Sequence, residues 1–130
     1  MKFARNVFRI AGIYGLLNLL PQYFFEERIG RDFPPPITHP ELFYGFLGVA
    51  AAWQLVYLWI ARDPQRFRPM MPLAVIAKAS FGVPTVALFF AGRVHALVHF
   101  FAWVDLLLGA LFAVAYSKTP EAPSPVKGME

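Results

Sequence analysis

Two ionisable residues lie within long apolar stretches of this sequence, where a charged side chain is costly to place. Lys78 lies in the apolar run 72–91, and Asp105 lies in the run 95–116. Ionisable residues inside membrane-spanning segments are rare because lipid solvates charge poorly, and those that occur often form proton relays or ligand sites. Asp105 could therefore carry a proton or anchor the polar group of a ligand.

Three uncharged polar residues are predicted to lie near these two. With a rise of 1.5 Å per residue, Asn18 and Asp105 each lie about 16 Å from the same membrane surface. By the same rise, Tyr14, Gln54 and Lys78 lie roughly 9–11 Å from that surface. We therefore expect a polar layer that draws on four helices, and all five residues are candidate ligand-binding residues.

The interpretation of Asp105 and Lys78 has a purely structural alternative. Asp105 could form an interhelical bond to Asn18 or Lys78 that only holds the helices together. A Lys78–Asp105 ion pair is attractive, but side chains lean toward the N-terminus of their helix, so on antiparallel helices these two lean apart. We therefore favour a Lys78 side chain that extends along its helix to the membrane surface.

Two histidines are four residues apart on one face of the last apolar run. The spacing of His95 and His99 could place two imidazoles on one metal ion or beside a haem. The pair lacks the glutamate of an HExxH motif, and no other apolar run contains a histidine. We predict no metal site, leave His95 and His99 as the only metal candidates, and expect them to hydrogen-bond to the loop 26–40. No motif assigns a catalytic residue or a cofactor.

The elements that must position these residues are four apolar spans. They cover about residues 7–25, 42–61, 72–91 and 95–116. Each has about 20 residues, which is enough to cross a membrane. The chain is 58% hydrophobic and 15% charged, against about 25% charged residues in soluble proteins. We predict an all-α, membrane-spanning antiparallel four-helix bundle over residues 1–117, followed by a disordered cytoplasmic tail, 118–130.

The distribution of basic residues predicts the orientation of the bundle, because cytoplasmic loops carry an excess of Lys and Arg. Of the twelve basic residues, eight lie on one side of the predicted spans, three lie on the other, and Lys78 lies within a span. We expect both termini in the cytoplasm (N-in/C-in), in a multi-pass protein of the inner (plasma) membrane.

Charge and cysteine content exclude several other classes of function. The net charge is +4, but the basic residues are scattered at span ends rather than grouped on one face, so we expect no nucleic-acid partner. The chain has no cysteine, which excludes disulfides, thiolate metal sites and cysteine nucleophiles. We expect membrane lipids to be its immediate surroundings.

Four short segments carry a pattern that occurs in a known class of membrane protein. They are RIAGIYG (9–15), HPELFYGF (39–46), ARDP (61–64) and DLLLG (105–109). In these segments the chain resembles small bacterial four-helix integral membrane proteins, broadly DoxX-like. The resemblance implies a compact bundle, in some members a membrane subunit beside a quinone-linked oxidoreductase, and it transfers no catalytic residue. A more distant similarity is to four-helix sterol-binding and sterol-isomerising proteins, but their buried acidic pair has only Asp105 as a counterpart here.

These observations favour a non-catalytic function. We expect a bundle that binds a lipid or quinone ligand, or that serves as an accessory to a partner membrane subunit or in a homo-oligomer. The alternative is a membrane enzyme that acts on a lipid-like or sterol-like substrate, with Asp105 as acid or base and Lys78 or Asn18 as an electrostatic helper. A transporter is a third reading, but four helices are few for alternating access and the sequence shows no inverted repeat.

Overall fold

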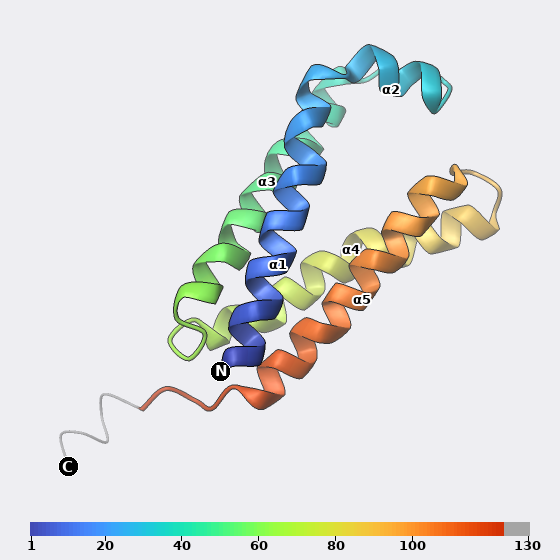
Figure 1. Cartoon of the computed structure of the whole chain (residues 1–130). Coiled ribbons are helices and arrows are strands. Elements are labelled where there is room, and N and C mark those ends of the chain that lie inside the picture. The colour runs from blue at the N-terminus through green and yellow to red at the C-terminus, as the bar shows by residue number, and fades with distance from the viewer. Residues whose placement is uncertain (124–130) are drawn as a thin grey trace.

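The computed structural model describes residues 1–123, and all regular secondary structure in that part of the chain is helical. Four long helices are joined by shorter helical segments and loops (Figure 1). In chain order the elements are α1 (Lys2–Leu19), η1 (Leu20–Phe24), α2 (Glu26–Asp32), α3 (Pro40–Arg62), η2 (Arg68–Met70), α4 (Met71–Phe90) and α5 (Ala96–Lys118). The predicted all-α class is confirmed.

The helix ends follow from local backbone chemistry. Pro40 occupies the first position of α3, where its missing N–H removes no hydrogen bond. Gly92 follows α4 with a φ of +74°, the left-handed conformation that commonly ends a helix. The helices α3, α4 and α5 begin and end within two residues of the predicted spans 42–61, 72–91 and 95–116. The first predicted span, 7–25, is wrong at both ends, because α1 begins at Lys2 and ends at Leu19, where Pro21 forces the change to the 3-10 helix η1.

Three helical stretches are long and apolar enough to cross a membrane. They are Pro40–Arg62, Arg68–Phe90 and Ala96–Lys118, each with 23 residues. The helix α1 differs from these three because Lys2, Arg5 and Arg9 all lie among its 18 residues. Length and composition thus support a membrane protein with at least these three apolar helices.

The four long helices form two antiparallel pairs, α1 with α3 and α4 with α5 (Figure 1). The pairs meet where α1 begins and α5 ends, an end of the molecule that we call the base. They diverge toward the opposite, far end, which holds α2 and the turn between α4 and α5. Between the pairs, α1 packs mainly on α5, whereas α3 and α4 touch little.

Aromatic rings hold the two pairs together near the base. The Phe8 ring of α1 stacks on the Phe112 ring of α5, with 4.2 Å between centroids and an interplanar angle of 11°. Tyr57 of α3 completes the cluster, 4.9 Å from the Phe112 ring. All three side chains are almost completely buried. Burial of rings of this size makes a large hydrophobic contribution to the junction.

The base is also tied together by the segment after α5. The Arg68 Nε donates to the carbonyl oxygen of Thr119 at 2.7 Å, and its guanidinium lies 3.9 Å from the centre of the Tyr116 ring. Thr119 itself is only 2% exposed. The predicted disordered tail, 118–130, therefore begins too early, because α5 includes Lys118 and Thr119 is packed; residues 124–130 of that tail lie outside the described residues.

Close approach within each helix pair depends on glycine. A Cβ atom at Gly12 of α1 would lie 2.9 Å from the backbone carbonyl oxygen of Gln54 in α3, which is closer than carbon and oxygen normally approach. In the other pair, a Cβ atom at Gly82 of α4 would lie 2.7 Å from the side chain of Leu106 in α5. Small residues of this kind allow helices in lipid to gain van der Waals contact along their backbones.

We expect Gly12→Ala to destabilise the protein, because the new methyl group meets backbone and forces α1 away from α3. Overpacking of this kind costs about 1–3 kcal/mol. Gly45→Ala is the matched control, since nothing lies within 4 Å of its Cβ position and alanine favours a helix over glycine. The measurement is the thermal midpoint of each purified variant in detergent. A Gly12→Ala variant as stable as Gly45→Ala would contradict the close-packing argument.

Candidate functional site

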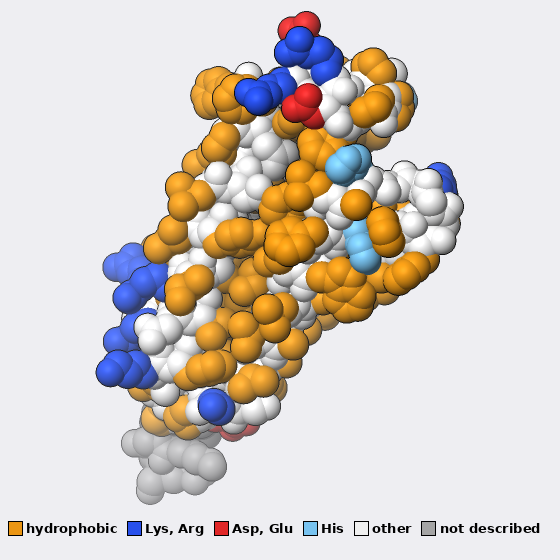
Figure 2. All heavy atoms as spheres, turned by 45° about the vertical axis from the view of Figure 1, so that its right-hand side comes forward, with side chains coloured by type: hydrophobic (Ala, Val, Ile, Leu, Met, Phe, Trp, Pro, Cys, Tyr) orange, Lys and Arg blue, Asp and Glu red, His pale blue; other side chains and the backbone are white. Residues whose placement is uncertain are grey.

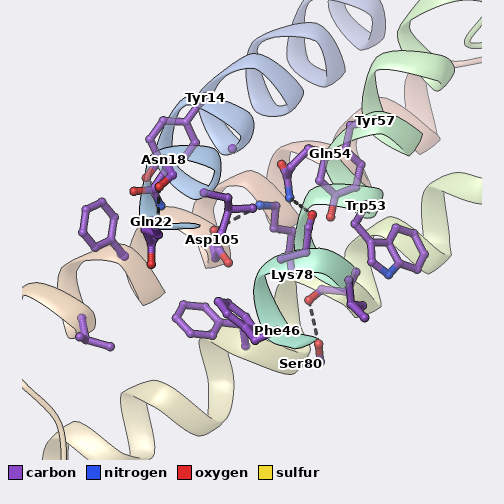
Figure 3. A pocket seen from close by; sticks show the side chains of 18 of the residues that line it. Tyr14, Asn18, Gln22, Phe46, Trp53, Gln54, Tyr57, Lys78, Ser80 and Asp105 are labelled. Carbon is purple, nitrogen blue, oxygen red and sulfur yellow. Dashed lines mark hydrogen bonds and ion pairs between the residues drawn. The ribbon is translucent and has the colours of Figure 1, made fainter. Parts of the chain in front are cut away.

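A cavity of about 1050 Å³ lies between the two helix pairs, where they diverge above the base. All four long helices line it, together with Ile29 of α2 and Phe33 just after α2 (Figure 3). The face shown in Figure 2 is largely apolar, with basic side chains at the far end and along one flank from about mid-height to the base. The cavity therefore places a few polar groups inside a molecule that exposes many large hydrophobic side chains.

The structure brings all five candidate ligand-binding residues to this one cavity. They come from four different helices and converge on its floor (Figure 3). The five are Tyr14 and Asn18 from α1, Gln54 from α3, Lys78 from α4 and Asp105 from α5. The predicted polar layer thus corresponds to the floor of a cavity rather than to a packed helix interface.

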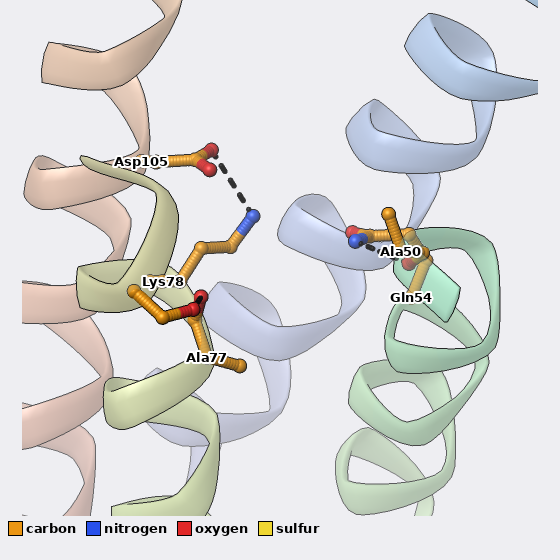
Figure 4. Close-up of polar contacts among 6 residues, drawn as sticks. Ala50, Gln54, Ala77, Lys78 and Asp105 are labelled. Atoms are coloured by element: carbon orange, nitrogen blue, oxygen red, sulfur yellow. Dashed lines mark hydrogen bonds and ion pairs between the residues drawn. The ribbon is translucent and has the colours of Figure 1, made fainter. Parts of the chain in front are cut away.

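Lys78 and Asp105 form an ion pair, so the expectation that Lys78 extends to the membrane surface is wrong. The Lys78 Nζ lies 3.2 Å from Asp105 Oδ1, and the two side chains are only 6% and 21% exposed (Figure 4). A Cβ atom at Gly109 would lie 3.3 Å from the Lys78 Cβ, so α4 and α5 approach closely there. From that level the four-carbon side chain of Lys78 is long enough to reach Asp105, one helical turn away from Gly109 on α5. This reach outweighs the general tendency of helical side chains to lean toward the N-terminus of their helix.

Gln54 is held in the gap between α3 and α1. Its Nε2 donates to the backbone oxygen of Ala50 at 2.9 Å (Figure 4). The Gln54 amide lies directly against Gly15, where any side chain would collide with it. Among the described residues, Gln54 Oε1 is the one sealed side-chain polar atom without a hydrogen-bond partner. The position of Gln54 therefore depends on the missing side chain at Gly15.

Several polar or aromatic lining residues were missed in the sequence, among them Tyr57, Trp53 and Gln22. Tyr57 is three residues after Gln54, which places both on one face of α3. That spacing was the available signal, but an aromatic residue in an apolar span resembles a core residue. Its ring does pack in the core at the base, while its hydroxyl points into the cavity, and Lys78 Nζ lies 5.3 Å from the ring centre (Figure 3).

The cavity walls are apolar, and one side opens between α3 and α4. Phe46 and Phe81 face each other across this opening, with ring centroids 6.0 Å apart. Val49 of α3 and Ile76 of α4 also line the cavity, yet they are 64% and 62% exposed. Side chains that are both lining and exposed mark the rim of an opening to the surroundings of the helices.

The loop between α1 and α3 covers the cavity at the far end. The Phe33 ring meets the ring of His95, at the start of α5, edge-on with centroids 4.9 Å apart. The Tyr44 hydroxyl donates to Glu26 Oε2 at 3.0 Å, which ties α2 to α3. The covering loop therefore bridges the two helix pairs where the helices themselves have separated.

The two histidines are engaged separately. His95 caps α5, because its Nδ1 accepts the backbone N–H of Leu97 at 3.0 Å. His99 Nε2 accepts from the indole N–H of Trp103 at 2.7 Å, and its ring stacks on Phe89 with 3.7 Å between centroids. In residues 1–123 there is no group of three or more His, Cys, Asp or Glu side chains that could hold a metal ion. His95 contacts the loop 26–40 through Phe33 rather than through a hydrogen bond.

The cavity combines a polar floor, whose two charged groups balance, with apolar walls. Lys78 and Asp105 are the only charged side chains that line it within residues 1–123, and each neutralises the other. Such an arrangement suits an amphiphile, because apolar walls can bury the surface of a ligand while a few polar groups fix its orientation. Asp105 is also the single carboxylate among these lining residues, so no paired-carboxylate chemistry is built there.

Comparison with known proteins identifies no relative. No protein-family model matches the chain, and no curated protein and no solved structure is similar to it.

We expect Lys78→Met to destabilise the protein, because it leaves the Asp105 carboxylate buried without its cation. Breaking a buried pair in this way costs roughly 3–5 kcal/mol. The double variant Lys78→Met/Asp105→Asn should recover most of the loss, since it leaves no unpaired charge. Thermal midpoints in detergent measure the effect, with Lys2→Met, at an exposed position, as the control for loss of a lysine. Losses that simply add in the double variant would show that the two side chains are not coupled.

Proposed function

We propose that the chain is a multi-pass protein of the inner (plasma) membrane, with four spans and both termini in the cytoplasm. Three apolar helices of 23 residues support the membrane location. The antiparallel packing of α1 on α3 supports a fourth span, because α1 runs alongside a membrane-capable helix. The basic residues gathered at the base support the proposed orientation.

We propose that the cavity binds one membrane amphiphile, of the lipid or quinone class, with its polar head on the floor and its chain toward the lipid. The observation that carries this proposal is the convergence of Asp105, Lys78, Gln54, Asn18 and Tyr14 beneath apolar walls. The opening between α3 and α4 supports lateral entry, since its rim residues are apolar and exposed.

The resemblance to DoxX-like proteins extends the proposal to partners. We propose that the bundle acts as an accessory that presents its ligand to a partner membrane subunit or to a second copy of itself. The enzymatic alternative has less support for two reasons. Lys78 already pairs with one oxygen of Asp105, and within residues 1–123 no second carboxylate lines the cavity to take part in proton transfer.

The orientation can be tested by cysteine labelling, because the chain has no natural cysteine. Arg93→Cys lies in the turn at the far end, and Arg66→Cys lies in the loop at the base; both positions are exposed. In intact spheroplasts, we expect a membrane-impermeant maleimide to label Arg93→Cys and to label Arg66→Cys only after permeabilisation. The reverse pattern would contradict the orientation, and equal labelling of both would contradict the four-span topology.

The ligand-binding proposal can be tested on protein isolated from its own membranes. We expect mass spectrometry of the extracted lipids to find one amphiphile in near-stoichiometric amount. Ala77→Trp fills the cavity from α4 and should lose most of this ligand. Ala87→Trp, at an exposed position of the same helix outside the cavity lining, should retain it. Equal retention by both variants would show that the amphiphile does not occupy this cavity.

A further inference from the structure

We propose that the cavity selects an amphiphile with an uncharged head that carries a carbonyl or hydroxyl group, and that the Tyr57 hydroxyl is a determinant of this selectivity. This inference rests on the proposed function and narrows its ligand class. It is carried by two independent observations, the charge balance of the lining and an unpartnered hydroxyl at the floor.

The charge balance disfavours an ionised head group. An anionic head could reach a cation only at Lys78, because no arginine is among the described lining residues. It would have to take Lys78 from Asp105 and leave that carboxylate in an apolar cavity without a partner, which is strongly unfavourable. A cationic head meets the converse problem, because it would take Asp105 and leave Lys78 unpaired. An uncharged head leaves the pair intact.

The Tyr57 hydroxyl is held in place and lacks a partner. The residue is only 1% exposed, and its ring is fixed between Phe8, Phe112 and Trp53, at centroid distances of 6.2, 4.9 and 6.2 Å. Its hydroxyl has no hydrogen-bond partner in the described part of the chain, and unlike Gln54 Oε1 it is not sealed off. A nearly buried hydroxyl without a partner is costly, and a ligand carbonyl or hydroxyl would remove that cost.

Other uncharged groups on the floor complement the same head. Tyr14 and Asn18 are four residues apart on α1, so their side chains share the face that lines the cavity. Asp105 Oδ1 is taken by Lys78, and Oδ2 has no hydrogen-bond partner among residues 1–123. The floor thus offers hydroxyl and amide donors together with acceptors, which a carbonyl or hydroxyl can satisfy without any change in net charge.

Trp53 provides a reporter for the test, because it lines the cavity. In a Trp59→Phe/Trp103→Phe background of the full chain, Trp53 is the one remaining tryptophan. The probes are dibrominated stearyl alcohol and dibrominated stearyl sulfate, which share a quenching chain and differ in head charge. Each is titrated in detergent micelles, and quenching is recorded against its mole fraction in the micelle.

We expect saturable quenching of Trp53 by the alcohol at a mole fraction about tenfold lower than for the sulfate. Tyr57→Phe, which keeps the ring, should weaken binding of the alcohol about 3- to 10-fold and leave that of the sulfate unchanged. Tyr23→Phe, outside the cavity lining, is the matched control and should change neither.

The possible failures separate the two proposals. If neither probe quenches Trp53 saturably, the cavity binds no amphiphile and both proposals are overturned. If both bind and the sulfate binds equally well or better, the proposed function stands and the uncharged-head inference is overturned. If Tyr57→Phe has the same effect as Tyr23→Phe on the alcohol, the role of the Tyr57 hydroxyl is overturned.

Discussion

The ion pair between Lys78 and Asp105 is the constraint on which the rest of the site depends. Each charge lies in an apolar helix, and neither is favourable there without the other. Because the two residues lie on α4 and α5, the pair fixes the register of these helices at the level where Gly109 lets them approach. It also leaves the lining of the cavity without net charge among the described residues, and the proposed uncharged head group rests on this balance.

The ion pair lies in a cavity because the two helix pairs diverge. The Phe8, Tyr57 and Phe112 rings join the pairs tightly near the base, and above them α3 and α4 separate. Had the pairs packed along their full length, the same polar residues would have satisfied one another across a closed interface. Because they separate, the polar residues form the floor of an open cavity, and Phe33 and its loop are needed to cover the far end.

The sequence was sufficient to predict α3, α4 and α5, but it misplaced the first helix and did not predict α2. It named five residues that line the cavity, missed others such as Tyr57, and gave no information on the shape of the cavity. Span length and the fixed rise per residue placed Tyr14, Asn18 and Asp105 at compatible depths without any knowledge of packing. The pairing of Lys78 with Asp105 was not predicted. The tendency of helical side chains to lean toward the helix N-terminus is weak, and the long, flexible lysine side chain can overcome it. The divergence of α3 from α4 could not be predicted, since it follows from which glycines and rings meet, and those contacts exist only in the folded chain.

Gln54 and Tyr57 lie on one face of α3, and each has a polar group without a hydrogen-bond partner. They show that the structure is needed to separate a structural residue from a candidate ligand-binding residue. Gln54 Oε1 is sealed against Gly15, so no ligand can reach it, and the amide serves to join α3 to α1. One turn nearer the base, the Tyr57 hydroxyl also lacks a partner, but it is not fully sealed and borders the cavity. In the sequence the two residues are three positions apart in one apolar span, and nothing there indicates that their surroundings differ. The difference in the roles that we propose arises because Gln54 packs against a neighbouring helix, whereas the Tyr57 hydroxyl borders the cavity between the helix pairs.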